Sequence, residues 1–305
     1  MSLRDLWFAW NKFWFAQGSP LPVAVYRIAI GFLAIVFYWW ISPEATDFFG
    51  THRIVQSSTV ERWMGSPQLD VLSFLPQDDF WIYAALKLLL FSGVCLILGV
   101  FSRANALVVY LVMLSFDTRN HFVLNTGIKI MIVMSLLLVF SRCGEALSLK
   151  RVAKIWRHGK TNVGPPKDGS IFVQRLMQVQ MALVYWSAAS CKLHGPSWID
   201  GSAVYYAAHL TQFQRFASPL LDQLWLCRLL SWGTISFELS FPFLIWIKEL
   251  RYPLLIIGVL FHIGLDWAMV IPLFQLVMVA GYLPFVEAKD YARIVNVLLG
   301  IRKAT

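Results

Sequence analysis

Leu21-Pro-Val-Ala-Val-Tyr-Arg-Ile-Ala-Ile-Gly-Phe-Leu-Ala-Ile-Val-Phe-Tyr-Trp-Trp-Ile41 is an apolar run with a single charged residue, Arg27. A straight helix needs roughly 20 apolar residues to cross the hydrocarbon layer of a bilayer. The run therefore predicts a transmembrane helix. Composition agrees, because 58% of the 305 residues are hydrophobic and 14% are charged, whereas soluble domains carry about 25% charged residues.

Further apolar runs follow along the chain, and together they predict an all-α, polytopic membrane bundle of about eight transmembrane helices. The third, fourth and eighth runs are shorter than a straight span needs. The predicted spans are Leu21–Ile41, Phe80–Val100, Ala104–Phe116, Gly127–Phe140, Ile171–Ala189, Leu224–Ile247, Tyr252–Val270 and Ile271–Phe285.

Charge gives an independent prediction of topology, because cytoplasmic loops accumulate Lys and Arg. Alternating spans place most of the 26 basic residues on the side of the N-terminus, so we expect both termini in the cytoplasm. The basic loop at 142–167 is expected to face anionic lipid. The net charge of +9 follows from this topology, and no motif for nucleic-acid binding accompanies it. The basic residues on that side are Arg4, Lys12, Arg103, Arg142, Lys150, Arg151, Lys154, Arg157, Lys160, Lys167, Lys248, Arg251, Lys289, Arg293, Arg302 and Lys303.

Three segments are predicted to lie outside the spans of the bundle at residues 21–285. Residues 1–20 are rich in Trp and Phe, which is typical of an amphipathic helix in the membrane interface. Residues 286–305 are expected to form a cytoplasmic tail. Residues 42–79 are predicted to pack as a small external cap of helices around Trp63, Met64, Leu72 and Phe74.

The sequence offers no familiar template for soluble-enzyme chemistry and no metal site. It has no dinucleotide, phosphate-loop, zinc-protease or serine-hydrolase signature. The four cysteines form no Cys-x-x-Cys pair. Cys191 and Cys227 fall on the same predicted side, so a disulfide is one interpretation, but two separate apolar thiols are favoured.

Ionisable residues at membrane depth are the remaining functional candidates, because a bilayer penalises idle charge. Span direction places most of them in the outer half of the membrane and Glu238 near its middle. They are Lys87, His121, Lys129, Lys192, Glu238, His262 and Asp266.

Each candidate has a structural and a chemical interpretation. Lys192 is either an interfacial lysine at a helix end or a general base, and Lys129 either snorkels to water or joins the site. Glu238 either neutralises a buried lysine or takes part in chemistry. His262 and Asp266 are four apart, so they predict an acid/base pair on one helix face, with a structural interhelical contact as the alternative.

Several short motifs follow one another in a recognisable order. Gln174 and Gln178 lie one turn apart, ahead of Tyr185, Lys192-Leu193, Trp198 and Gly201. The others are Arg119-Asn120-His121, Phe140–Ser148, Phe237-Glu238-Leu239 and Phe261-His262 through Phe274. With these motifs nearly the whole chain resembles the HTTM (horizontally transferred transmembrane) domain of vitamin K-dependent γ-carboxylases and their bacterial relatives.

The resemblance implies a membrane bundle that binds a reduced vitamin K or menaquinone-type quinol and uses it with oxygen. Lys192 matches the lysine that deprotonates the quinol, Asn120 and His121 match a motif of the quinol site, and His262 matches a late helix histidine. We therefore expect Lys192, His121 and His262 to be catalytic. The expected cofactor-binding residues are Asn120, Lys129, Trp198, Glu238, Asp266 and Tyr185.

Some features depart from the family pattern. The carboxylases carry a large globular region after the bundle, so carboxylation of protein glutamate is not expected of these 305 residues. Cys191 stands where the family has a second lysine, and Lys150 follows Ser148-Leu149 where an acid is expected.

Two functional hypotheses follow. The first is a quinol-dependent, carboxylase-like membrane oxidoreductase. The second is a non-enzymatic, SdpB-type maturation factor that holds a lipid, a quinone, an exported peptide or a partner protein. A transporter ranks third, since no inverted repeat is evident. A bacterial inner membrane is the expected location.

Overall fold

The computed structural model describes residues 2–64, 69–76 and 78–298, and it is all-α apart from one short pair of strands. The chain divides into two compact units. The first unit comprises Met1–Leu176 with Val286–Thr305, and the second comprises Met177–Phe285. The predicted all-α class is confirmed.

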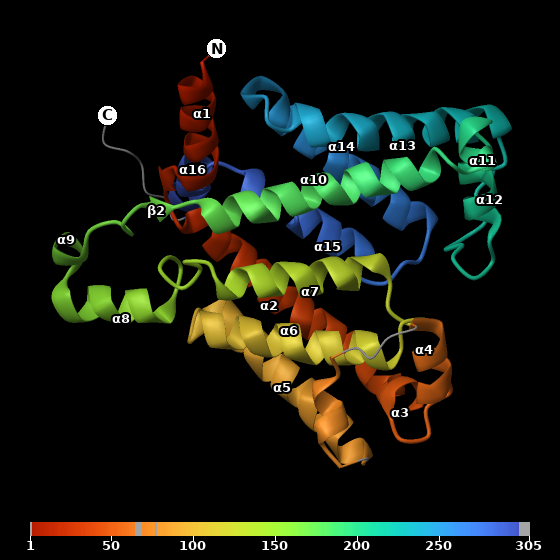
Figure 1. Cartoon of the computed structure of the whole chain (residues 1–305), viewed down its shortest axis with the longest axis horizontal. Coiled ribbons are helices and arrows are strands. Elements are labelled where there is room, and N and C mark those ends of the chain that lie inside the picture. Colours follow the sequence, from red (N-terminus) through yellow and green to blue (C-terminus); the bar gives the residue numbers. More distant parts are fainter. Residues whose placement is uncertain (1, 65–68, 77, 299–305) are drawn as a thin grey trace. The chain divides into compact units, whose positions relative to one another are not determined.

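Four long helices form the body of the first unit: α2 (Leu21–Ile41), α5 (Asp79–Leu98), α6 (Ser102–Arg119) and α7 (Thr126–Val139). In sequence order α5 packs on α2, α6 on α5, and α7 on α6 (Figure 1). Local sequence sets two helix starts, because the side chains of Asp78 and Asn125 accept N–H groups of the first turns of α5 and α7. The buried core includes Ile30, Phe37, Leu86, Phe116 and Met131.

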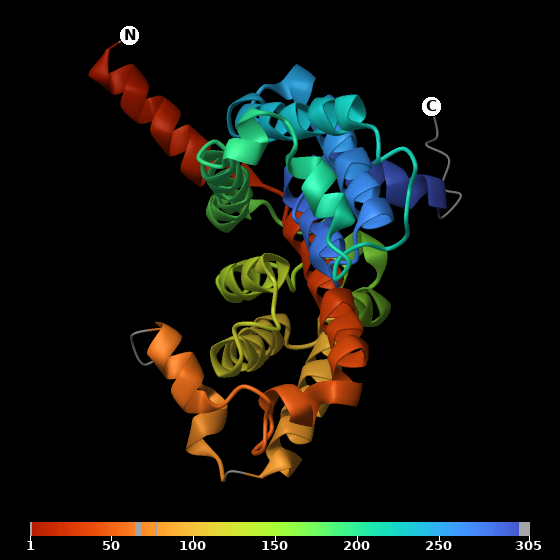
Figure 2. The same ribbon diagram turned by 90° about the vertical axis from the view of Figure 1, so that its right-hand side faces the viewer.

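Shorter elements surround these helices. The pair of strands is antiparallel, with Gln17 opposite Ser170. The end of α1 lies beside the start of α10 (Phe172–Lys192) (Figure 2). There the ring of Phe172 stacks on Phe15, with ring centroids 5.3 Å apart. The elements are α1 (Leu3–Phe15), β1 (Gln17–Gly18), η1 (Ser42–Glu44), α3 (Ala45–Phe49), α4 (Ser57–Met64), η2 (Val71–Phe74), α8 (Leu149–His158), α9 (Lys160–Val163), β2 (Gly169–Ser170) and α16 (Ala288–Leu298).

The second unit is organised around α10 (Phe172–Lys192), α13 (Leu224–Leu244) and α14 (Lys248–Ala268). Helix α14 packs on α13 and on the short α15, and α13 also packs on α11 and α12. The aromatic side chains of Tyr185, Phe241 and Tyr282 fill its centre. The short elements are α11 (Pro196–Ile199), α12 (Ala203–His209), α15 (Phe274–Ala280) and η3 (Leu283–Phe285).

The first seven predicted spans coincide closely with helices, but these helices differ in length and polarity. Among the described residues, three helical segments are long and apolar enough to cross a membrane by length and composition, namely Leu21–Phe49, Asp79–Leu98 and Lys248–Ala268. The count of eight spans and the cytoplasmic side of the termini therefore stay predictions. Residues 1 and 299–305 of the predicted terminal segments lie outside the described residues.

The eighth predicted span is not one continuous helix. Leu273 adopts a left-handed conformation with φ of 61°, and α15 runs from Phe274 only to Ala280. A helix of this length covers about 10 Å, a third of the hydrocarbon layer. Pro272 and Pro284 lack a backbone N–H, which explains why the apolar run does not extend as one helix.

The described part of the segment at residues 42–79 contains short helices, as predicted, but two of the aromatic side chains expected in its core are exposed. Trp63 is 75% exposed and Phe74 is 80% exposed, whereas Leu72 is buried. The side chain of Met64 lies outside the described part of the chain. Its position on the external side stays a prediction.

The four cysteine thiols are free. Cys191 is exposed, whereas Cys227 is buried and its Sγ lies 3.2 Å from the carbonyl oxygen of Leu221. The interpretation of Cys191 and Cys227 as two separate thiols therefore agrees with the structure.

Two glycines allow α2 and α5 to approach closely. A Cβ atom on Gly31 would lie 2.6 Å from the carbonyl oxygen of Gly93, and a Cβ on Gly93 would lie 2.8 Å from the carbonyl oxygen of Gly31. Small residues at a helix crossing allow backbones to pack in membrane proteins. Gly31 and Gly93 therefore define the spacing of this helix pair.

Gly31→Ala is expected to lower the free energy of unfolding by about 1–3 kcal/mol, because the added methyl group meets backbone atoms that cannot move aside. The matched control is Gly264→Ala in α14, where a Cβ would meet no atom within 4 Å. Thermal unfolding in detergent measures both. Equal melting temperatures for the two variants would contradict the close crossing.

Candidate functional site

Lys192 and Glu238 form an ion pair in the second unit. Lys192 is the last residue of α10 and Glu238 lies on α13. The lysine Nζ lies 2.8 Å from each carboxylate oxygen, and the side chains are only 22% and 7% exposed. The interpretation of Glu238 as the residue that neutralises a buried lysine is confirmed.

Trp198 covers the same lysine. It belongs to α11, and its ring centroid lies 5.1 Å from Lys192 Nζ, within range of a cation–π interaction. The turn after it requires glycine, because Gly201 has φ of 83° and a Cβ there would lie 2.8 Å from Cγ of Arg228. The Trp-x-x-Gly motif thus packs the loop against α13 and positions the indole over the ammonium group.

The exposed Asp200 in this loop has a different partner. The Ser202 hydroxyl donates to its Oδ1 at 2.6 Å, and the Ser202 backbone N–H donates to the same oxygen at 2.8 Å. These hydrogen bonds hold the pKa of the Asp200 carboxyl below its ordinary range. Asp200 therefore stabilises the turn, whereas Glu238 is the ion-pair partner of Lys192.

His262 lies in a buried chain of hydrogen bonds. Its Nδ1 is 2.6 Å from Oε1 of Gln275, and its Nε2 is 2.8 Å from the hydroxyl of Tyr185, which also contacts the hydroxyl of Tyr282. An amide oxygen accepts, so Nδ1 carries the proton and Nε2 accepts from Tyr185. Tyr185 then accepts from Tyr282, so the chain has one direction from Tyr282 to His262.

The side-chain amide of Gln275 is only partly hydrogen-bonded. Gln275 is 6% exposed, and among the described residues its Nε2 has no hydrogen-bond partner. It lines a pocket of about 430 Å³ together with His262, Arg215, Asp266 and apolar side chains of α14 and α15. The pocket therefore combines apolar walls with a buried N–H donor.

The predicted acid/base pair of His262 and Asp266 is wrong. The Asp266 carboxylate is 56% exposed and lies 3.3 Å from Arg215, while His262 binds Gln275 instead. The spacing of four residues places both on one side of α14, but Gln275 from α15 offers His262 a partner at 2.6 Å. Asp266 contributes to the rim of the same pocket.

His121 lies between two charged side chains in the first unit. Lys129 Nζ is 2.6 Å from its Nε2, and its Nδ1 lies 2.8 Å from the backbone oxygen and 3.3 Å from Oδ2 of Asp117. A lysine ammonium can only donate, so His121 accepts at Nε2 and directs its Nδ1 proton toward Asp117. Within the described residues, Oδ1 of the buried Asp117 has no hydrogen-bond partner.

Asn120 holds the segment at 42–79 onto α6. Its Nδ2 donates to the carbonyl oxygen of Phe48 at 3.1 Å, and its Oδ1 accepts the N–H of Phe122 at 3.2 Å. Next to it, Arg119 binds Asp70 at 2.9 Å. These bonds explain the Arg-Asn-His motif structurally, and cofactor binding by Asn120 stays a prediction.

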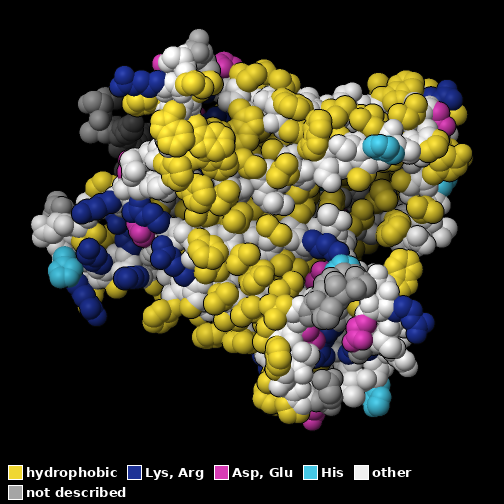
Figure 3. Space-filling model, viewed as in Figure 1, with side chains coloured by type: hydrophobic (Ala, Val, Ile, Leu, Met, Phe, Trp, Pro, Cys, Tyr) yellow, Lys and Arg dark blue, Asp and Glu magenta, His cyan; other side chains and the backbone are white. Residues whose placement is uncertain are grey.

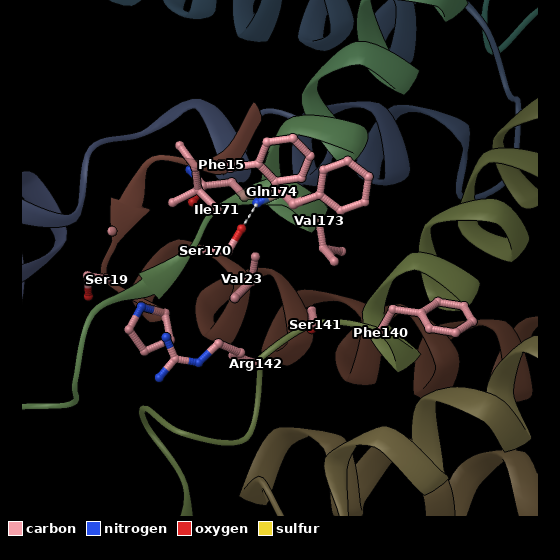
Figure 4. A pocket seen from close by; sticks show the side chains of 13 residues that line it. Phe15, Ser19, Val23, Phe140, Ser141, Arg142, Ser170, Ile171, Val173 and Gln174 are labelled. Carbon is pink, nitrogen blue, oxygen red and sulfur yellow. Dashed lines mark hydrogen bonds between the residues drawn. The ribbon is translucent and has the colours of Figure 1, made fainter. Parts of the chain in front are cut away.

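A separate pocket of about 310 Å³ lies beside the pair of strands in the first unit. Phe15, Phe140 and Val173 line it together with Arg142 (Figure 4). The Arg142 guanidinium is bound by Glu145 through two of its nitrogens. None of the predicted catalytic residues lines this pocket.

The predicted site residues thus belong to two groups. The first unit holds His121, Asn120 and Lys129, and a single site that combines both groups stays a prediction. The second unit holds Tyr185, Lys192, Trp198, Glu238, His262 and Asp266.

Sequence reasoning missed three side chains of these groups. Asp117 precedes His121 by four residues, and that spacing could have indicated it. Gln275 and Tyr282 lie in an apolar run and carry no charge at neutral pH, so a search for charge at membrane depth does not find them. Only the packing of α15 and the residues after it brings them to His262 and Tyr185.

Fold and site together define an all-α membrane protein with ionisable side chains paired within its helical units. A family model described as the HTTM domain matches residues 19–289, and the chain belongs to this family. The resemblance to the HTTM family is therefore confirmed. Comparison with curated proteins and with solved structures finds no significant match.

Lys192→Met should destabilise the protein, because it leaves the Glu238 carboxylate buried without its partner. We expect a loss of up to about 3 kcal/mol, less than for a fully buried pair because Lys192 is partly exposed. Adding Glu238→Gln should recover most of the loss. Chemical or thermal unfolding measures the cycle, with Lys87→Met at the exposed face of α5 as the control. A double variant as unstable as the single one would contradict the pairing.

Proposed function

We propose that this HTTM protein is a quinol-dependent membrane oxidoreductase of carboxylase-like type, in which the Lys192–Glu238 pair accepts a proton from a lipid quinol. The pair at the end of an apolar helix is the observation that carries the proposal. Keeping an ion pair out of water costs free energy, so its place in such a helix favours a chemical role. Membership of the family supports the same class of reaction.

The pocket of the second unit has a volume and a lining that suit a quinol. Its volume of about 430 Å³ lies within the usual range for small-molecule sites. Apolar side chains such as Val259, Ile263 and Leu276 suit an aromatic ring with an isoprenoid tail. The Nε2 of Gln275, which has no partner among the described residues, suits a ring oxygen. Gln275, His262 and the rim residues Arg215 and Asp266 would hold the group.

A quinol, when bound, supplies electrons and protons for a reaction with oxygen. The protein's part is to take up the protons. The hydroxyls of Tyr185 and Tyr282 lie within electrostatic range of Glu238 and are hydrogen-bonded to each other. The Tyr185 hydroxyl is also hydrogen-bonded to His262, which lines the pocket. We propose this hydrogen-bonded series as the pocket side of a proton route; among the described residues no hydrogen bond joins it to the Lys192–Glu238 pair.

Charge balance supports the pair as the acceptor. Lysine and glutamate together carry no net charge, so uptake of one proton creates a single positive charge rather than two. The Trp198 ring lies beside that charge and stabilises it through its π face. Transfer of a proton from the Lys192 ammonium to Glu238 within the pair would give the neutral amine without changing the net charge. Lys192 in that form is the group proposed to act as base, and Glu238 positions it.

The first unit contains a second group that can accept a proton. His121 receives a hydrogen bond from Lys129 and is oriented by Asp117. We propose His121 as a catalytic residue and Lys129 and Asn120 as residues that position it. The family resemblance of the Arg-Asn-His motif supports this role.

A non-enzymatic function is the alternative. Glu238 neutralises Lys192, and such a pair can serve the fold alone. In that case the apolar pocket holds a lipid, a quinone or an exported peptide during maturation of a partner protein, as an SdpB-type factor would. This alternative expects Lys192 to be dispensable and the pocket walls to be required.

We further propose a bacterial inner-membrane location, with eight spans and both termini in the cytoplasm. The uneven distribution of Lys and Arg between alternate loops supports this topology. A reporter fused in the loop after Lys160 should then be cytoplasmic, and one near Arg215 should be external.

Purified protein in nanodiscs is expected to consume oxygen when menaquinol or phylloquinol is added. Lys192→Ala should lower the rate at least about 100-fold, since a positioned general base contributes that much. The control Lys87→Ala removes an exposed lysine of α5 and should keep the rate. An oxygen electrode measures all three proteins.

Two outcomes would contradict the proposal. Absence of quinol-dependent uptake by the wild-type protein favours the non-enzymatic alternative. Equal uptake by Lys192→Ala and wild type removes Lys192 from the reaction. A folding control, the melting temperature of each variant, separates lost chemistry from lost structure.

A further inference from the structure

A large pocket of about 900 Å³ opens at the N-terminal end of α6 in the first unit. None of the residues proposed for quinol chemistry lines it. Its lining comes from the turn before α6, the segment after α7 and the first turns of α8, and includes Phe101, Ser102, Arg103, Arg142, Glu145 and Lys150.

The start of α6 presents donors to this pocket. The first N–H groups of a helix have no partner within the helix, and its dipole favours an anion there. No side chain caps this end, because Phe101 occupies the cap position with φ of 42°. Ser102 is only 5% exposed and lines the pocket, and its Oγ has no hydrogen-bond partner among the described residues. A buried hydroxyl without a partner marks a place for a ligand oxygen.

The charges around the pocket favour an anion as well. Arg103 uses its Nε to bind the carbonyl oxygen of Ser141 at 2.8 Å, and its side chain is exposed. Lys150 is also exposed, in the first turn of α8. The Arg142 guanidinium is already bound by Glu145, the acidic residue in the pocket lining. It is also attracted electrostatically by Asp168. Arg103 and Lys150 therefore supply the positive charge for a ligand.

The surface of helix α8 indicates which kind of molecule bears the anionic group that this pocket binds. Its apolar residues Leu149, Val152 and Trp156 are 47%, 59% and 86% exposed, next to a row of basic side chains. Basic side chains gather over α8 on the surface (Figure 3). A short helix with exposed apolar residues and a basic face is typical of a segment that lies in the headgroup layer of a membrane. The pocket opens beside this helix, so its ligand is expected to come from the same layer.

We propose that this pocket binds the phosphodiester headgroup of an anionic phospholipid. Ser102 Oγ and the first N–H groups of α6 donate to the phosphate oxygens, while Arg103 and Lys150 supply charge. Phe101, which is 83% exposed, and Leu149 contact the upper part of the acyl chains. Bound lipid would fix α8 against α6 without any role in the quinol reaction.

Native mass spectrometry of the full chain in detergent tests the proposal with phosphatidylglycerol and phosphatidylcholine as probes. The wild-type protein should retain phosphatidylglycerol in preference to phosphatidylcholine. Arg103→Gln with Lys150→Gln should weaken that binding roughly 25-fold, about fivefold for each charge removed. The matched control is Lys154→Gln with Arg157→Gln, which removes two charges of α8 that do not line the pocket.

Equal losses in the two double variants would mean a diffuse basic surface and would overturn the site. Equal retention of the two lipids would overturn it as well. Displacement of bound phosphatidylglycerol by millimolar inorganic phosphate would assign the pocket to a free phosphate and also contradict the proposal. Ser102→Ala gives a second, uncharged variant, expected to weaken phosphatidylglycerol binding while the lipid-free melting temperature stays within a few degrees of wild type.

Discussion

Three charged side chains in the helical units of this protein, Arg27, Lys129 and Lys192, have partners supplied by the protein itself. Hydrocarbon offers neither water nor counterions, so an ionised group at that depth must be paired or hydrogen-bonded. Arg27, fully buried in α2, donates to the carbonyl oxygens of Cys143 and Leu147 at 2.7 and 2.6 Å. Lys192 meets Glu238, and Lys129 meets His121. These pairings connect helices that would otherwise be held by apolar packing alone.

The same requirement makes chemistry possible. A lysine that binds a carboxylate through both oxygens is held in one place, and its charge is balanced without water. The hydrogen-bonded series of Tyr282, Tyr185 and His262 then extends polar contact to a pocket with apolar walls. Structural pairing and the proposed proton transfer would use the same side chains, which is why stability and oxygen uptake have to be measured on the same variants.

Sequence reasoning succeeded where the signal is local. Apolar runs depend on neighbouring residues, so the predicted spans coincide with helices, and Leu21–Ile41 has the bounds of α2. The ion pair of Lys192 and Glu238 could be predicted, because a glutamate and a lysine in apolar runs have few other possible partners. Local reasoning failed at His262, where the spacing to Asp266 describes one helix, while the actual partner Gln275 comes from another. It failed at residues 271–285 because a left-handed Leu273 divides the run.

A quinol site in the pocket between α14 and α15 is the central claim of this account. A photoreactive quinone, followed by peptide mapping, tests it most directly. The account predicts labelling within residues 259–279, loss of that labelling with excess menaquinol, and weaker labelling in Gln275→Leu. Labelling confined to other segments, such as the pocket beside the pair of strands, or labelling that menaquinol does not compete, would contradict it.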